Sequence, residues 1–199
     1  DHRLDEYTLS KLLEAARSTL SAQLPVSEEL TEQVREFLTR RVRFVLQDQG
    51  VPFDILNAVV APGIQGVYQT WLKAQALMQM RGEADFEALA IAFKRVKNIL
   101  TKQKIVLEAV SESDLEDLAE KDLYAGFREI EPIVSTAVQA GDYLTALRKI
   151  ASLRSRVDRL FDAVMVLTDD ARLRNNRLRL LFEISQTVWK IADISEIQA

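Results

Sequence analysis

The sequence predicts an all-α protein with two helical modules, the second of them a helical bundle. Apolar residues recur every three to four positions along most of the chain, which is the spacing of amphipathic helices. No strand pattern for a nucleotide-binding sheet is present. The segment Pro62–Gly66 (PGIQG) is the clearest internal break, and it separates an N-terminal pair of helices from those that follow.

The composition narrows the classes of protein to consider. Of 199 residues, 48% are apolar, enough for a core, and the net charge of -4 argues against a surface devoted entirely to nucleic acid. With no cysteine and one histidine, His2, the chain lacks the residues of a disulfide framework or a transition-metal cluster. No apolar run is long enough to span a bilayer, and the N-terminus lacks the layout of a signal peptide. We therefore expect no metal site, no membrane contact and a cytoplasmic location.

Helical patterns follow one another through the first part of the chain. The expected helices span residues 4–24, 28–49, 53–61 and 67–80. Ser27 is the expected N-cap of the second helix, and Gly50 is placed to end it. Tyr68 and Trp71 are expected in the core. Arginines crowd the outer faces of the second helix, at Arg35, Arg40, Arg41 and Arg43. Such a run is usually a solvated face, and contact with nucleic acid is the alternative.

The helix predicted from Phe86 to about Lys104 carries a mixed polar stripe. Its members at i, i+4 and i+8 are Lys94, Asn98 and Lys102, flanked by Arg95 and Lys97. Basic side chains bind phosphates and an amide can pair with a base edge, so this composition suits a helix that lies against an RNA loop. A solvated polar face is the alternative.

Acidic residues dominate from Glu108 to Glu131. Because an acidic face repels phosphate, we expect this segment on the side away from RNA, or against another protein surface. Ser113 and Glu116 fit a capping box. Gly126 and Pro132 predict either two helices or one kinked helix.

Two helical arms joined by an acidic turn close the chain. The first is predicted from Tyr143 to about Leu167, and the second carries apolar residues from Leu173 to Ile191. Basic and amide side chains gather where the second arm begins, at Arg172, Arg174, Asn175, Asn176 and Arg177. Such a corner can hold an anion. For Arg177, a structural bond to Asp162 or Asp169 is the alternative.

Motifs for catalysis are missing from the sequence. It contains no Gly-rich phosphate loop, no nucleophile elbow and no residues for a His-containing triad. The acidic pairs follow the periodicity of a helix surface. We expect no catalytic residues in this chain.

The most specific resemblance lies in the C-terminal arms. The run VDRLFDAVMVLTDDARLRNNRLRLL, closing in ADIS, resembles the anticodon-binding domain of the bacterial two-subunit glycyl-tRNA synthetase beta subunit. Asp170–Arg174 (DARLR) resembles the Asp-Ala-Leu-Arg signature of this DALR-type domain, with one more residue between the Ala and the Leu. Phe86–Leu100 and Gly50–Ala61 are similar to the helix that opens the domain and to the region before it. The related domain of arginyl-tRNA synthetase is the alternative, and the ending VWKIADISEIQ favours the glycyl family.

The resemblance implies a division of the chain and a role. Residues 1–24 would end an HD-like helical domain or form a linker, residues 25–85 would form a helical body, and residues 86–199 would form the DALR-like anticodon-binding bundle. The bundle would bind the anticodon stem-loop of tRNA-Gly, and the alpha subunit would attach glycine with ATP and magnesium. The implied partners are tRNA-Gly, the alpha subunit and the rest of the beta subunit, with no DNA.

RNA loops offer unstacked bases that side chains can read, so recognition is expected at the loop. The expected tRNA contacts are Lys94, Arg95, Lys97, Asn98, Arg172, Arg174, Asn175 and Arg177. The arginines and lysines would hold phosphates, and the asparagines would read bases. A non-catalytic module that docks other parts of a synthetase complex is the alternative function.

Overall fold

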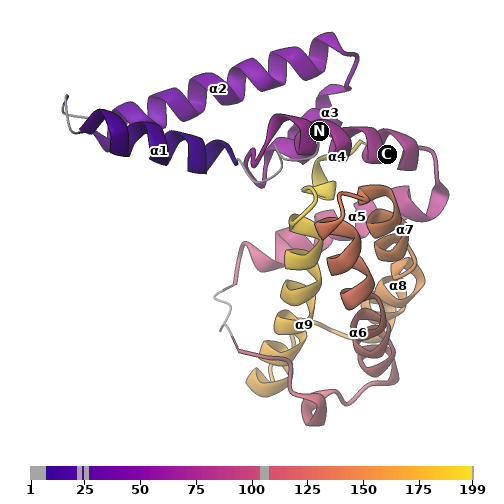
Figure 1. Cartoon of the computed structure of the whole chain (residues 1–199). Coiled ribbons are helices and arrows are strands. Elements are labelled where there is room, and N and C mark those ends of the chain that lie inside the picture. Colours follow the sequence, from indigo (N-terminus) through magenta and orange to yellow (C-terminus); the bar gives the residue numbers. More distant parts are fainter. Residues whose placement is uncertain (1–7, 22–23, 25–26, 104–107, 199) are drawn as a thin grey trace.

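The predicted all-α fold is confirmed, and it consists of a helical body with a projecting two-helix arm (Figure 1). The computed structural model describes residues 8–21, 24, 27–103 and 108–198, and these ranges contain no β-strand. The α-helices are α1 (Leu9–Ser21), α2 (Glu28–Asp48), α3 (Phe53–Val60), α4 (Val67–Met80), α5 (Ala84–Leu100), α6 (Leu118–Gln139), α7 (Tyr143–Ala151), α8 (Arg154–Ala163) and α9 (Ala171–Trp189). Two short 3-10 helices are η2 (Glu112–Asp114) and η3 (Ile194–Glu196).

The arm consists of α1 and α2, drawn in indigo and purple (Figure 1). Ser27 caps α2 as predicted, because its hydroxyl accepts a hydrogen bond from the Leu30 amide at 3.1 Å. Gly50 ends the helix with a φ of 82°, a left-handed conformation that glycine adopts without strain. Large apolar side chains stay exposed along α2, namely Leu30, Val34, Phe37, Phe44 and Val45. Two arginines of the basic run pair with glutamates of the same helix, Arg35 with Glu32 and Arg40 with Glu36.

One continuous core joins the end of the arm to the body. Its buried apolar residues run from Val42 in α2 to Ile197 after η3. Within the body, α6 packs against α7, α8 and α9, while α4 packs against α7. Helix α5 contacts α7, α8, α9 and η3, and this central place puts one of its faces against the core.

The structure decides three expectations about the body, and the first and third of them are wrong. The helix predicted over residues 143–167 is broken at Ser152 and Leu153 into α7 and α8. Residues 118–139 form one helix, α6, which continues through Pro132. Tyr68 and Trp71 are not in the core, because they remain 55% and 37% exposed and stack on each other with ring centroids 6.1 Å apart.

Gly126 of α6 allows a close approach by α8. A Cβ atom at this position would lie 2.7 Å from Cδ of Arg156, a distance that would force this side chain to move. In the structure the Arg156 guanidinium reaches Asp122 of α6 at 3.2 Å, and Arg159 binds the same carboxylate at 2.5 Å. Glycine at position 126 therefore leaves room for the Arg156 side chain to cross α6 and reach Asp122.

Candidate nucleic-acid interface

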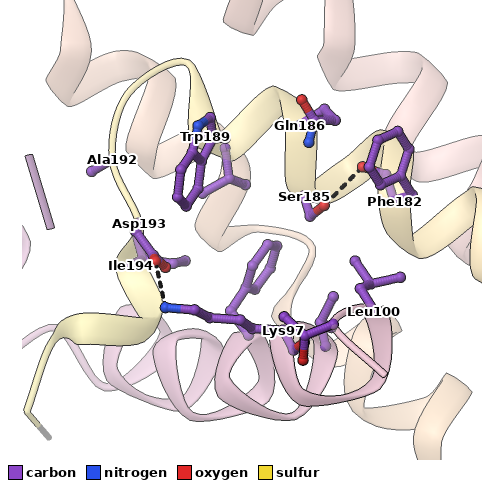
Figure 2. A pocket seen from close by; sticks show the side chains of 13 residues that line it. Lys97, Leu100, Phe182, Ser185, Gln186, Trp189, Ala192, Asp193 and Ile194 are labelled. Atoms are coloured by element: carbon purple, nitrogen blue, oxygen red, sulfur yellow. Dashed lines mark hydrogen bonds and ion pairs between the residues drawn. The ribbon is translucent and has the colours of Figure 1, made fainter. Parts of the chain in front are cut away.

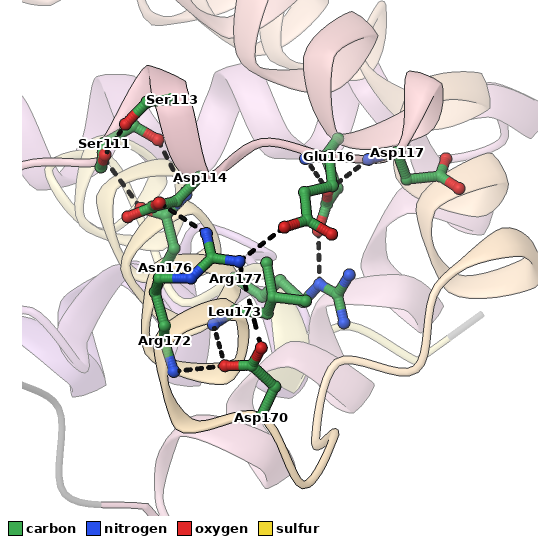
Figure 3. Close-up of polar contacts among 11 residues, drawn as sticks. Ser111, Ser113, Asp114, Glu116, Asp117, Asp170, Arg172, Leu173, Asn176 and Arg177 are labelled. Atoms are coloured by element: carbon green, nitrogen blue, oxygen red, sulfur yellow. Dashed lines mark hydrogen bonds and ion pairs between the residues drawn. The ribbon is translucent and has the colours of Figure 1, made fainter.

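Helix α9 begins at the acidic turn that the sequence predicts. Asp170 is its N-cap, and one carboxylate oxygen accepts from the amides of Arg172 and Leu173 at 2.8 and 3.3 Å (Figure 3). The first two turns of α9 therefore present the residues singled out above. We refer to Arg172, Arg174, Asn175 and Arg177 as the α9 corner.

Carboxylates from the segment between α5 and α6 bind the first arginine of the corner. We call residues 108–117 of this segment the linker. The Arg172 guanidinium binds Asp114 and Glu116, both at 2.6 Å, with Asp170 at 4.0 Å (Figure 3). The hydrogen bonds to Glu116 and Asp114 raise the pKa of Arg172 above its ordinary value. In turn, the hydrogen bonds from Arg172 and Ser111 lower the pKa of Asp114. Arg172 is thus neutralised by acidic side chains about sixty positions away in the sequence.

The last arginine of the corner forms a buried ion pair. Arg177 donates through Nε to Glu120, which has no exposed side-chain surface, and Arg177 itself is 11% exposed. The second oxygen of Glu120 accepts from the amides of Glu116 and Asp117 at 2.8 and 2.7 Å. Arg177 also donates to the Met165 carbonyl at 3.0 Å. The sequence left open whether Arg177 binds RNA or forms a bond within the fold. In the structure Arg177 forms a bond within the fold, and its partner is Glu120 rather than the expected Asp162 or Asp169.

These contacts overturn one expectation about the acidic segment and show where that segment lies relative to α9. The capping box at the start of α6 consists of Asp117 and Glu120, so the prediction of Ser113 and Glu116 is wrong. The linker, which leads into this capping box, lies along α9, and its Glu108 pairs with Arg179. The acidic segment therefore lies against the α9 corner, where its carboxylates pair with Arg172 and Arg177.

The two adjacent asparagines at the start of α9, Asn175 and Asn176, differ in their surroundings. Asn176, which is 1% exposed, binds both backbone groups of Ser111, accepting from its N–H at 2.8 Å and donating to its carbonyl at 2.9 Å. No local pattern in the sequence predicts that Asn176 fastens the linker, because Ser111 lies 65 positions away. Asn175 is half-buried. Arg174 donates to the carbonyls of Thr168 and Asp169 at 2.8 and 3.3 Å, and this contact closes the turn.

Two of the predicted contacts on α5 hold the fold together. The guanidinium of Arg95 lies 4.1 Å from the ring centroid of Phe161 in α8, a cation–π geometry. Lys97 binds Asp193 at 2.7 Å and Glu196 at 2.8 Å, which fastens the ADIS segment to α5. Burial alone would lower the pKa of Lys97, but these two hydrogen bonds raise it.

The other polar residues of α5 are available to a ligand. Lys94, Asn98 and Lys102 are exposed, and among the described residues the structure records no ion pair or side-chain hydrogen bond for any of the three. They are four residues apart: Lys94 and Asn98 lie along one side of α5, and Lys102 follows in the turn after the helix ends at Leu100. We call these three residues the α5 stripe.

The α5 stripe and the α9 corner lie at different levels of the bundle. Helix α5 meets the second half of α9, where a groove is lined by residues of both helices, including Lys97 and Gln186. Asn175 and Gln186 are eleven positions apart, roughly 16 Å along a helix that rises 1.5 Å per residue. The structure therefore does not bring the eight predicted residues into one cluster.

The groove beside the α5 stripe has a volume of about 310 Å³ (Figure 2). Its walls are mostly apolar and include Phe93, Val96, Leu100, Phe182, Val188 and Trp189. Trp189 is 39% exposed, so part of its indole is open to solvent. Ser185 and Gln186 supply polar groups on the α9 side, and the Ser185 hydroxyl is used by a hydrogen bond to the Phe182 carbonyl at 2.8 Å.

Comparison with known proteins places this geometry in a family. Residues 89–199 match the model of the DALR anticodon binding domain. The chain belongs to the DALR anticodon-binding domain family. It is also 39% identical to the glycine–tRNA ligase beta subunit of Acidobacterium capsulatum and 39% identical to that of Geotalea uraniireducens, and both matches cover 96% of this chain and 28% of the relative. The beta subunit of Ralstonia nicotianae is 37% identical, over 96% of this chain and 27% of the relative.

The predicted resemblance to the glycyl-tRNA synthetase beta subunit is confirmed by these matches, which extend through α2, α3 and α4 as well as the DALR domain. The chain spans a little over a quarter of the length of these relatives. Across the residues that the structure describes, no group of three or more histidine, cysteine or acidic side chains could hold a metal ion. The same residues include no helix that is both long and apolar enough to cross a membrane.

Proposed function

We propose that this chain is the tRNA-recognition part of a glycyl-tRNA synthetase beta subunit and binds the anticodon stem-loop of tRNA-Gly. The observation that carries the proposal is the α5 stripe, in which two lysines and an amide are exposed on a helix of a DALR domain with no carboxylate partner among the described residues. Lysines can neutralise phosphates, and the amide of Asn98 can pair with a base edge.

The α9 corner has a supporting role in this proposal. A phosphate that approached Arg172 would have to displace carboxylates already bound at 2.6 Å. Arg177 and Arg174 are committed to Glu120 and to backbone carbonyls. Of the eight residues predicted from the sequence, Lys94 and Asn98 therefore keep the strongest case for RNA contact, with Asn175 next.

The rest of the holoenzyme would supply catalysis. We assign the attachment of glycine, with ATP and magnesium, to the alpha subunit, and propose that subunit and the remainder of the beta subunit as protein partners. A cytoplasmic location follows from this proposed role. The chain itself would position the tRNA and contribute no reacting group.

A titration with two RNA hairpins tests the proposal. Glycine anticodons end in two cytosines, so the anticodon stem-loop of tRNA-Gly is compared with a hairpin in which both cytosines are replaced, at low and moderate salt. Lys94→Ala should weaken binding to both hairpins about five- to tenfold and reduce the salt slope by about 0.7–0.9, one phosphate contact. Asn98→Ala should instead reduce the preference for the cytosine-containing hairpin, because a base-edge contact is worth about 1–3 kcal/mol of discrimination.

Lys149→Ala is the matched control, since Lys149 is an exposed lysine on a different helix, α7. It should leave both affinities unchanged. If Lys94→Ala and Lys149→Ala weaken RNA affinity equally, the lysines of the α5 stripe act only through the overall charge of the protein. If the chain binds no RNA at low salt, the proposal is wrong.

The exposed apolar residues of α2 favour a second role for the arm. Phe37 and Phe44 are both 60% exposed, and a helix face of this kind is usually covered by another protein surface. We propose that the arm docks another part of the synthetase. Such an apolar contact should persist at salt concentrations that abolish RNA binding.

A further inference from the structure

We propose that the groove between α5 and α9 binds one unpaired base of an RNA loop, stacked on the indole of Trp189. This inference rests on the proposed function and names the part of the RNA that enters the chain. It is carried by the groove, by the partly open tryptophan in its wall and by two exposed lysines, Lys94 and Lys102, that have no ion-pair partner among the described residues.

The groove has the size and lining of a site for a flat aromatic ring. Its volume of about 310 Å³ lies at the lower end of the range of about 300–1,000 Å³ found for small-molecule pockets. Figure 2 shows Trp189 and Phe182 on the α9 side and Leu100 on the α5 side of an apolar space. Every base offers a π-face, and stacking on an aromatic side chain is how proteins hold unpaired bases without a duplex.

The polar groups at the rim suit the remaining parts of a nucleotide. Gln186 is exposed, and the structure shows no hydrogen bond from its side chain among the described residues, so its amide can meet the edge of a stacked base. Thr101, the C-cap of α5, lines the groove, and the exposed Asn98 lies three residues before it on the helix. Lys94 and Lys102 do not line the groove, but each is exposed and directly follows a residue that does, so they can supply charge for phosphates of the same RNA strand.

Charge favours RNA over a peptide as the occupant. The carboxylate of Asp193, at the end of the groove, is bound by Lys97 at 2.7 Å and by the Ser195 hydroxyl at 2.5 Å. Glu196 shares the same lysine at 2.8 Å. The nearby acids are thus held within the fold, whereas Lys94 and Lys102 have no carboxylate partner among the described residues. An apolar slot beside two unpaired lysines is complementary to a base with its flanking phosphates.

Tryptophan fluorescence reports on this site directly. The chain has two tryptophans, so Trp71→Phe leaves Trp189 as the only one. This variant is titrated with the anticodon stem-loop of tRNA-Gly and, as a matched control, with a blunt RNA duplex of the same stem. Binding is followed independently by the anisotropy of a dye on the RNA. We expect the hairpin, but not the duplex, to quench Trp189, and the complementary variant Trp189→Phe to show no quenching of Trp71.

Affinity variants complete the test. Trp189→Ala should weaken binding of the hairpin about tenfold or more, because a stacked base is lost, while duplex binding stays unchanged and Trp189→Phe restores most of the affinity. Thermal unfolding of each variant shows whether the fold is retained.

If the hairpin binds by anisotropy but leaves Trp189 fluorescence unchanged, the base site is wrong and the proposed function stands. If Trp189→Ala weakens hairpin and duplex equally, the groove does not select an unpaired base. If neither RNA binds at low salt, both proposals fail and a protein segment becomes the occupant to look for.

Discussion

At the start of α9 three arginines meet carboxylates or carbonyls, whereas on the outer face of α5 two lysines and an asparagine meet neither among the described residues. Both regions have the composition of a nucleic-acid site. They differ in what the rest of the chain places against them. Asp114 and Glu116 of the linker and Glu120 at the start of α6 cover the α9 corner, whereas no acidic side chain among the described residues pairs with the α5 stripe.

This difference shows that a cluster of basic residues in the sequence can be bound by groups of the same chain, so the cluster alone does not identify a surface that is free to bind RNA. In the α9 corner the arginines fasten the linker to α9 and close the turn before the helix. A guanidinium suits this work because its planar fork binds two carboxylates at once, as Arg172 does. Single lysines on α5 keep hydrated, mobile charges that a phosphate can reach without displacing another group.

The largest effect should follow from breaking the buried pair of the α9 corner. Glu120→Ala leaves Arg177 without its carboxylate and removes the partner of two backbone amides, so we expect a loss of about 3–5 kcal/mol in the free energy of unfolding. Urea denaturation measures it. Glu116→Ala is the comparison, because Glu116 is 55% exposed and reaches only an exposed arginine, so its loss should be much smaller. Similar losses for the two variants would show that the buried pair is not what secures the linker.

Local patterns predicted much of the fold but not the partners of the arginines. Ser27 and Asp142 cap helices as their sequence context suggests, because capping depends on residues only a few positions away. The partner of Arg172 lies 58 positions upstream and that of Arg177 lies 57 upstream, so helix periodicity carries no information about either.

The break between α7 and α8 was hidden for a related reason. The apolar spacing runs on through Ile150 and Val157, and no glycine or proline marks the turn at Ser152. Leu153 at the break is only 1% exposed, so tertiary packing rather than local sequence ends the first helix. The groove beside Trp189 was likewise invisible in the sequence, since it forms only where α5 and α9 meet.

An intermediate effect should come from freeing an arginine that the linker now occupies. The double substitution Asp114→Asn with Glu116→Gln removes the two carboxylates that bind Arg172 at 2.6 Å and leaves Asp170 at 4.0 Å. We expect RNA affinity to rise about three- to tenfold and the salt slope to steepen by about 0.7–0.9, as one more phosphate contact becomes available. The hairpin titration described above measures both quantities.

The matched control for this pair is Glu28→Gln with Glu29→Gln at the start of α2, which changes the net charge equally on the arm. An equal gain in affinity from the control would mean that net charge alone is responsible. No gain from the α9 pair would mean that RNA does not approach this end of the helix.

The smallest expected effect is a pH dependence of the same corner. The hydrogen bond from Arg172 lowers the pKa of Asp114 from its ordinary value of 3.8, so folding favours the ionised carboxylate. The stability from this contact is fully present above pH 3.8, the ordinary pKa that the unfolded chain shows, and is lost as the pH falls through the lower pKa of the folded state. Urea midpoints of the unsubstituted chain and of Asp114→Asn should differ most near neutral pH and converge in acid. With Arg172→Ala already present, Asp114→Asn should change the pH profile little. A difference that grows as the pH falls would mean that the Asp114 carboxylate is not stabilised by Arg172, and would remove the electrostatic distinction between the α9 corner and the α5 stripe.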